Sequence, residues 1–110
     1  MTIQNLGTTA LTTTGTPVWD PGSARSLLLH CACLGQPGAV SAGLLVHLCD
    51  GTATGAGTIA CITVPSDEAG AQPYGLGEGV QLTKGNPLCI KVPAGVGTVA
   101  GYFVGDYILG

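Results

Sequence analysis

The sequence predicts a single-domain, all-β fold: an antiparallel β-sandwich, jelly-roll-like, of seven or eight short strands. The chain has 110 residues, which suits one domain and leaves no room for two. Its 19 glycines and 7 prolines interrupt it at short intervals. No stretch repeats apolar residues at the three- and four-residue spacing of an amphipathic helix for long, so the intervening runs are expected to be strands.

Residues 1–22 are rich in threonine and irregular, and we interpret them as an amino-terminal arm or edge strand before a β-sandwich domain at 23–110. Pro17 and Pro21 cannot donate the hydrogen bonds that a central strand requires. An extended arm that reaches a neighbouring subunit is equally compatible with the pattern. The candidate interface residues of such an arm are Thr8, Thr12, Thr14 and Trp19. Trp19, the only tryptophan, is more typical of a plug on the domain's own core than of a ligand platform.

The strands of the main domain are predicted from residue 25 onward. Residues 25–34 are apolar on both alternating faces, which suits a strand that is covered on both sides. Residues 43–50 form the next strand, and the Asp50-Gly51 step before 58–64 predicts a hairpin. Further strands are expected at 74–82, 88–92 and 96–108.

The chain has few charged side chains. They make up 8% of the residues, against about 25% in ordinary globular domains. Charged residues are depleted at the cores of protein interfaces, so we expect partners to cover much of this surface. A threonine- and glycine-rich domain that is merely weakly charged is the alternative. The net charge is −3 and the three cations are scattered, which argues against a nucleic-acid partner and against binding to an anionic membrane.

Nothing in the sequence indicates export or membrane insertion. Residues 1–10 lack the basic and apolar regions of a signal peptide. The apolar run at 27–34 is interrupted by His30 and is far shorter than the roughly 20 residues of a membrane-spanning helix. We therefore expect a soluble chain that is made in a cytoplasm.

Five cysteines make the chain cysteine-rich, and they form no C-x-x-C pair: Cys31, Cys33, Cys49, Cys61 and Cys89. In a reducing cytosol they are expected to remain buried thiols, whereas a particle released from the cell could oxidise some of them. Cys31 and Cys33, about 7 Å apart on one strand, should not pair with each other. Cys49 and Cys61 flank the predicted hairpin and could face each other. Cys89 could bond to Cys31 or Cys33.

No catalytic, cofactor or metal site is predicted. His30 and His47 lie within apolar strands, where a hydrogen-bonded core or interface histidine is typical. Strand alternation would place His30 on the face opposite to Cys31. His47 and Cys49 share a face and could join two thiols around zinc, but the paired C-x₂₋₄-C motifs of structural zinc sites are absent. The glycine-rich stretches lack the G-K-[ST] ending of phosphate-binding loops.

Two stretches carry a family resemblance. Leu48-Cys49-Asp50-Gly51-Thr52, followed by Gly57-Thr58-Ile59-Ala60, resembles a pattern of small β-sandwich virion proteins of tailed bacteriophages, with Cys49 in place of the usual tyrosine. The closing alternation, which ends in Gly105-Asp106-Tyr107-Ile108, is similar too. The resemblance implies a capsid decoration (cement) protein, often a trimer, or a neck or tail protein. It implies no catalytic residues.

Composition and resemblance together predict a non-enzymatic virion structural protein. It would self-associate, as a homotrimer around a threefold axis, and bind the major capsid protein or other virion proteins. A carbohydrate- or receptor-binding β-module is one alternative, with Trp19, Tyr74, Tyr102, Phe103 and Tyr107 as the available aromatic residues. A small cysteine- or metal-dependent enzyme is the other.

Overall fold

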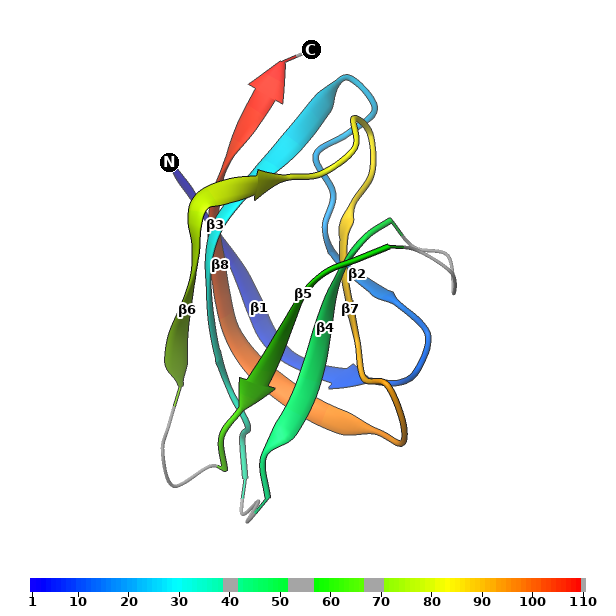
Figure 1. The fold of residues 1–110 in the computed structure, drawn as a ribbon, viewed down its shortest axis with the longest axis vertical. Helices are drawn as coiled ribbons and strands as arrows, with labels where there is room; N and C mark the ends of the chain where they lie inside the picture. The colour runs from blue at the N-terminus through cyan, green and yellow to red at the C-terminus, as the bar shows by residue number, and fades with distance from the viewer. Residues whose placement is uncertain (39–41, 52–56, 67–70, 110) are drawn as a thin grey trace.

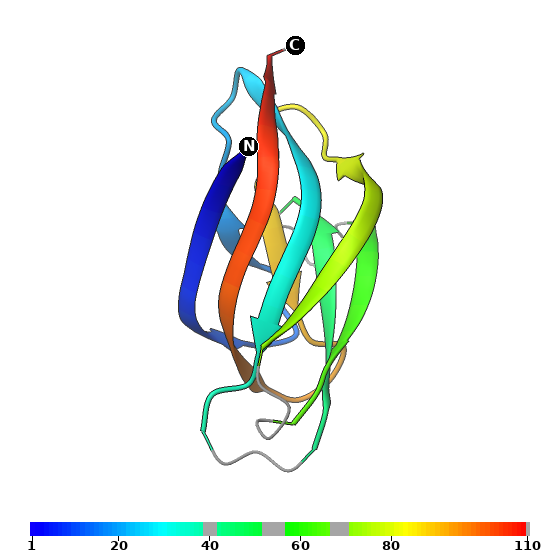
Figure 2. The ribbon, with the colours of Figure 1, turned by 90° about the vertical axis from the view of Figure 1, so that its left-hand side faces the viewer.

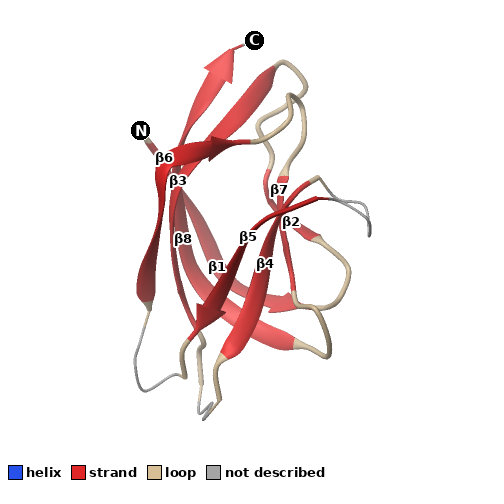
Figure 3. Ribbon diagram, in the orientation of Figure 1, coloured by secondary structure: helices blue, strands red, loops and turns tan. Residues whose placement is uncertain are grey.

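The computed structural model describes residues 1–38, 42–51, 57–66 and 71–109. These residues form eight strands and no helix (Figure 3). The strands build two four-stranded antiparallel sheets that face each other (Figure 1). The predicted all-β sandwich is confirmed. None of the described residues lies in a helix long and apolar enough to cross a membrane.

The first sheet, which we call sheet A, has the strand order β1-β8-β3-β6 and is seen face-on in Figure 2. Its long central strands are β8 (Gly97–Leu109) and β3 (Arg25–Gly35), which pair along almost their whole length. The outer strands are β1 (Thr2–Leu11) and β6 (Gln72–Gln81). Sheet A therefore joins the first and last strands of the chain to β3 and β6 in one layer.

The second sheet, sheet B, has the order β2-β7-β4-β5. Its central strands are β7 (Leu88–Lys91) and β4 (Leu44–Asp50), and its edges are β2 (Thr16–Trp19) and β5 (Gly57–Val64). The hairpin predicted around Asp50-Gly51 is the β4–β5 pair, although the loop residues 52–56 lie outside the described part of the chain.

The amino-terminal segment contributes one edge strand to each sheet. β1 pairs with β8 in sheet A, and β2 pairs with β7 in sheet B. Leu11 and Trp19 reach the core from this segment, and Trp19 is only 2% exposed. Thr8, Thr12 and Thr14 are exposed on the surface. The sequence allowed either an edge strand or an arm that reaches a neighbouring subunit. Within a single chain the segment forms edge strands.

Leucine, valine and isoleucine side chains fill the space between the sheets around Phe103, which is fully buried. Where β8 ends, an aromatic pair joins the sheets. The Trp19 ring meets Tyr107 edge-on at 5.8 Å, and its Nε1 donates a hydrogen bond to the Tyr107 hydroxyl at 2.9 Å. The Arg25 guanidinium lies 3.8 Å from the centre of the Tyr107 ring. The Trp19 side chain therefore packs inside the core of its own domain.

A β-bulge in β3 changes the predicted alternation of that strand. Between Leu29 and Cys31, β3 advances by two residues while its partner β8 advances by one, so His30 is the extra residue. His30 therefore lies on the same outer face of sheet A as Cys31 and Cys33. The prediction that His30 points to the opposite face was wrong, because strict alternation takes no account of a bulge.

Candidate interaction surface

The outer face of sheet A carries two rows of neutral residues, which we call the neutral face. Each row crosses all four strands through the pairings of β1 with β8, β8 with β3 and β3 with β6. The first row consists of Ile3, Val104, Cys31 and Gly75, and the second of Asn5, Tyr102, Cys33 and Pro73. No member of either row is a charged residue.

Large apolar groups of the neutral face are open to solvent. Ile3 is 62% exposed and Tyr102 is 38% exposed, while Val104 and the two cysteines are half-buried. The sequence predicted that β3 would be covered on both sides. Among the described residues no second layer covers this side of sheet A (Figure 2). One apolar face of β3 therefore packs against the core, and the other faces solvent.

Tyr102 and Cys33 are directly paired neighbours on this face. A side-chain hydrogen bond with Cys33 raises the pKa of the Tyr102 hydroxyl, and the nearby thiols raise it further. The Tyr102 hydroxyl is therefore neutral at physiological pH and adds polarity to the face without adding charge.

A shallow hollow of about 420 Å³ adjoins the second row. Cys33, Gly35, Tyr102, Gly101 and Ala71 are among its lining residues, and most of its surface is apolar. Gln36 also borders it, but the Gln36 amide donates hydrogen bonds to the backbone oxygens of Ala42 at 2.8 Å and Pro65 at 3.0 Å. The side-chain amide of Gln36 is thus already hydrogen-bonded within the chain. The hollow therefore offers a partner mainly apolar contacts.

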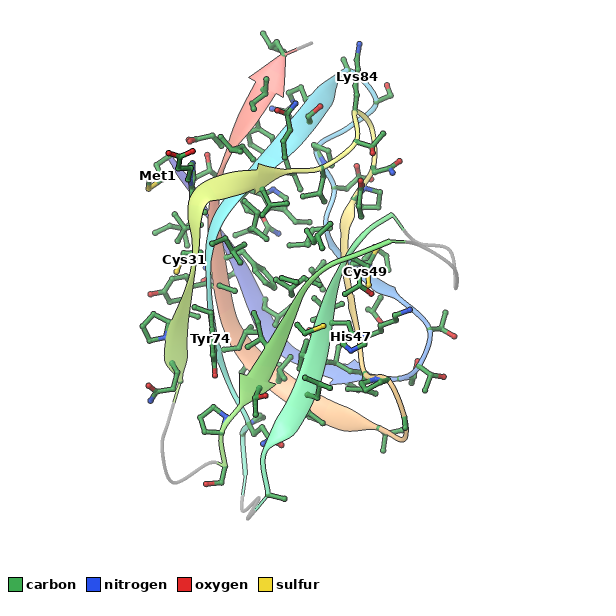
Figure 4. The ribbon with its side chains drawn as sticks, viewed as in Figure 1. Met1, Cys31, His47, Cys49, Tyr74 and Lys84 are labelled. Carbon is green, nitrogen blue, oxygen red and sulfur yellow. The ribbon has the colours of Figure 1, made fainter. Side chains whose placement is uncertain are left out.

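The opposite border of the neutral face holds a small paired charge cluster. One oxygen of Asp106 lies 3.2 Å from the amino group of Met1, and the other lies 2.8 Å from Nε2 of His30. The hydrogen bond from His30, then that from the amino terminus, lowers the pKa of the Asp106 carboxyl. Figure 4 shows Met1 and Cys31 on this outer side of sheet A. The carboxylate of Asp106 at this border is therefore paired with its neighbours.

The outer face of sheet B differs because it includes a cation. His47 lies between Cys61 on β5 and the cation Lys91 on β7, and Leu45 is exposed beside them.

All five cysteines are free thiols. Cys61 pairs with His47 and Cys49 pairs with Thr58, so the expectation that Cys61 could face Cys49 was wrong: the register of the β4–β5 pair keeps them on different rows.

Cys89 lies in sheet B, whereas Cys31 and Cys33 lie on the outer face of sheet A. The core separates them, which overturns the idea that Cys89 bonds to either one. Instead, Cys89 lies opposite Cys49. In the part of the chain that the structure describes, no three His, Cys, Asp or Glu side chains come together in a group that could hold a metal ion.

The aromatic residues do not form an exposed platform. Trp19 and Phe103 are buried, and Tyr107 packs against the core. The Tyr74 hydroxyl donates a hydrogen bond to the backbone oxygen of Thr63 at 2.7 Å, between the edges β6 and β5. Tyr102 alone of the five lies on the neutral face. The acidic pair Asp67 and Glu68, which contributes to the net charge, lies outside the described residues.

Sequence reasoning did not identify the neutral face, because its rows combine residues from four strands in a register that bulges shift. Comparisons with protein-family models, with curated proteins and with solved structures found no match for this chain.

Proposed function

We propose that the protein is a non-enzymatic structural module that self-associates and binds the surface of a larger assembly. The neutral face carries the proposal: it spans four strands, lacks charged residues and exposes Ile3 to solvent at 62%. Contiguous exposed apolar surface of this kind is typical of interaction sites. Charged residues are depleted at interface cores, which agrees with the low charge of the whole chain.

The dimensions of sheet A are adequate for an interface. Strands lie about 4.8 Å apart and rise about 3.3 Å per residue, so four strands of about ten residues cover roughly 600 Å² in projection. A standard interface buries about 800 Å² of accessible surface on each partner. Side chains and the adjoining hollow add area to the flat estimate, so sheet A alone can supply most of one interface.

A second copy of the chain is the partner that the charge distribution favours for the neutral face. The neutral face presents no charge that a second copy would have to match, and the nearby carboxylate of Asp106 is already paired with His30 and Met1. We propose a trimer, which is the form the resemblance implies; around a threefold axis the neutral face of one copy contacts a different surface of the next copy.

For the larger assembly we propose the capsid of a tailed phage. The support is the resemblance of residues 48–52 and 57–60 to small virion proteins, together with an all-β fold that suits that class. The protein would then be a capsid decoration protein in the virion, in contact with the major capsid protein. A place at the neck or tail is the alternative.

Size-exclusion chromatography with light scattering tests the self-association. We expect an oligomer for the unmodified chain and a shift toward monomer for Ile3→Lys, which puts a charge at the most exposed apolar residue of the neutral face, on its outer strand β1. Leu45→Lys is the matched control, because Leu45 is an exposed apolar strand residue on the outer face of sheet B. A chain that stays monomeric at high concentration contradicts the proposal, as does equal dissociation of both variants.

The virion location needs a separate experiment. Antibodies against the chain should label tailed-phage particles purified from the lysate that contains it. Label on the head supports capsid decoration, and label at the neck or tail supports the alternative position. Absence of the chain from purified particles contradicts a virion function.

A further inference from the structure

Cys49 on β4 and Cys89 on β7 lie directly opposite each other in the centre of sheet B. Both side chains are buried, with exposed fractions of 1% and 0%. We propose that this pair is a site of disulfide formation, which links β4 to β7 when the chain meets a small disulfide oxidant such as oxidised glutathione. The inference does not depend on the proposed function.

The register supplies the geometry that a disulfide needs. Directly opposed residues of an antiparallel pair have Cα atoms about 4.5 or 5.5 Å apart, depending on whether they exchange hydrogen bonds. Disulfides join Cα atoms about 4.4–6.8 Å apart, so either kind of pair qualifies. The two side chains share one face, because direct cross-strand partners always do. Formation of the bond therefore requires no change of register.

Both cysteines point away from the core. Their neighbours Leu48, Leu88 and Ile90 belong to the buried cluster between the sheets, and the two cysteines do not. Figure 4 shows Cys49 on the side of the molecule away from Cys31. A bond between Cys49 and Cys89 would therefore leave the packing between the sheets unchanged.

The other three cysteines have no comparable partner. Cys61 pairs with His47 across the β4–β5 ladder. Cys31 and Cys33 are two residues apart on β3, so their Cα atoms are about 6.6 Å apart, near the upper limit for a disulfide and farther apart than directly opposed residues of two strands. The pair Cys49–Cys89 is thus the one that the fold selects among five thiols, all of which lie in the described part of the chain.

The reaction proceeds by two thiol–disulfide exchanges. One cysteine thiolate attacks a sulfur of oxidised glutathione, forms a mixed disulfide and releases one glutathione thiolate. The second cysteine then attacks the protein sulfur of the mixed disulfide and releases the other glutathione. The two cysteines together lose two protons and two electrons, and oxidised glutathione becomes two molecules of reduced glutathione.

The fold controls when this reaction can occur. Burial, and to a smaller extent the neighbouring Cys49, Asp20 and Asp50, together raise the pKa of Cys89 to about 11. Very little Cys89 thiolate is therefore present in the folded chain near neutral pH, and burial gives the oxidant little access to either cysteine of the pair. The link should therefore form readily while the chain folds in an oxidising medium, and slowly once sheet B has closed.

The expected consequence is a more stable sheet B. The seam between β4 and β7 is only four residue pairs long, from His47–Lys91 to Asp50–Leu88. A covalent link inside this seam closes the long loop between residues 49 and 89. Loop closure of this length should raise the melting temperature by about 10–20 °C.

The test is to refold the full chain in oxidised or in reduced glutathione and to map the cysteines by mass spectrometry after pepsin digestion at low pH. The oxidised sample should contain a peptide pair joined through Cys49 and Cys89, about 2 Da lighter than the two free thiols. It should also melt at a higher temperature than the reduced sample. The same treatment of the already folded chain should give the link much more slowly.

Three variants complete the experiment. Cys49→Ala and Cys89→Ala should each lose the linked peptide and the rise in melting temperature, while Cys61→Ala should keep both. The proposal is overturned if the unmodified chain refolded in oxidised glutathione keeps both thiols free, or if its bonds map to other cysteines. It is also overturned if the link forms but Cys49→Ala shows the same rise. None of these outcomes depends on whether the chain self-associates.

Discussion

Nε2 of His30 lies 2.8 Å from Oδ2 of Asp106, although the two residues belong to different strands of sheet A. Both side chains lie on the outer face of sheet A, where Asp106 pairs with Leu28, two residues before His30 in β3. The amino group of Met1 approaches the other oxygen of Asp106 at 3.2 Å. Asp106 thus joins three strands of sheet A on their outer side: β1, β3 and β8.

This cluster predicts acid sensitivity. The hydrogen bond from His30 and then the amino terminus lower the pKa of Asp106 in the folded chain. A carboxyl whose pKa is lower when folded stabilises the fold above its unfolded pKa of about 3.9. That contribution is lost as the pH falls from there through the lowered value. Thermal melts between pH 7 and pH 2 should show a steeper acid decline for the unmodified chain than for Asp106→Asn.

The matched control for Asp106→Asn is Glu78→Gln, which removes an exposed carboxylate from β6. It should leave the acid decline unchanged. An Asp106→Asn variant that declines as steeply as the unmodified chain would show that the cluster does not contribute to acid stability.

The strands could be predicted from sequence because apolar alternation and turn residues are local signals. The run at 25–34 became β3 (Arg25–Gly35), and the Asp50-Gly51 step marked a true hairpin. Both signals depend on neighbours in the chain, so a single sequence contains them.

The neutral face and the cysteine pair could not be predicted, because they depend on which strands become neighbours. Cys49 and Cys89 meet since β7 inserts between β2 and β4, and nothing local specifies that order. The bulges are equally hidden from a local pattern: the extra residue at His30 puts Cys31 on the same face as His30. Alternation is a short-range rule, and one inserted residue reverses it for everything that follows.

The five thiols should react with iodoacetamide in an order set by exposure. Cys61 is exposed, Cys31 and Cys33 are half-buried, and Cys49 and Cys89 are buried. Burial also raises the pKa of Cys89 to about 11, which reduces its thiolate further. Timed alkylation of the reduced, folded chain, followed by mass spectrometry, should find Cys61 modified first and Cys89 among the last. Denatured chain provides the control, in which the five rates should converge.

An early modification of Cys89 in the folded chain would contradict this order. It would mean that the seam between β4 and β7 opens readily, and that the slow oxidation expected of the folded state does not hold.

Trp19→Phe should cost about 0.5–1.5 kcal/mol of unfolding free energy, because it removes the hydrogen bond from Nε1 to the Tyr107 hydroxyl while keeping most of the ring packing. Urea denaturation measures the change. Tyr107→Phe removes the same bond from the other side. If the bond is what each variant loses, the double variant should be less destabilised than the sum of the two singles. Additive losses would show that packing, and not the bond, is responsible.

Gly101→Ala should destabilise the chain by about 2–4 kcal/mol, because both space and backbone conformation exclude a side chain there. A Cβ atom at this position would lie 1.8 Å from the backbone oxygen of Cys33, and the residue has a φ of 146°, which favours glycine. Gly57→Ala is the control, since it lies in a strand with nothing within 4 Å of its Cβ position and no positive φ. Urea denaturation of both variants measures the difference. Equal stability of the two would mean that β8 and β3 can separate at Gly101 without cost, and that the edge of the neutral face beside Tyr102 is not held rigidly by the sheet.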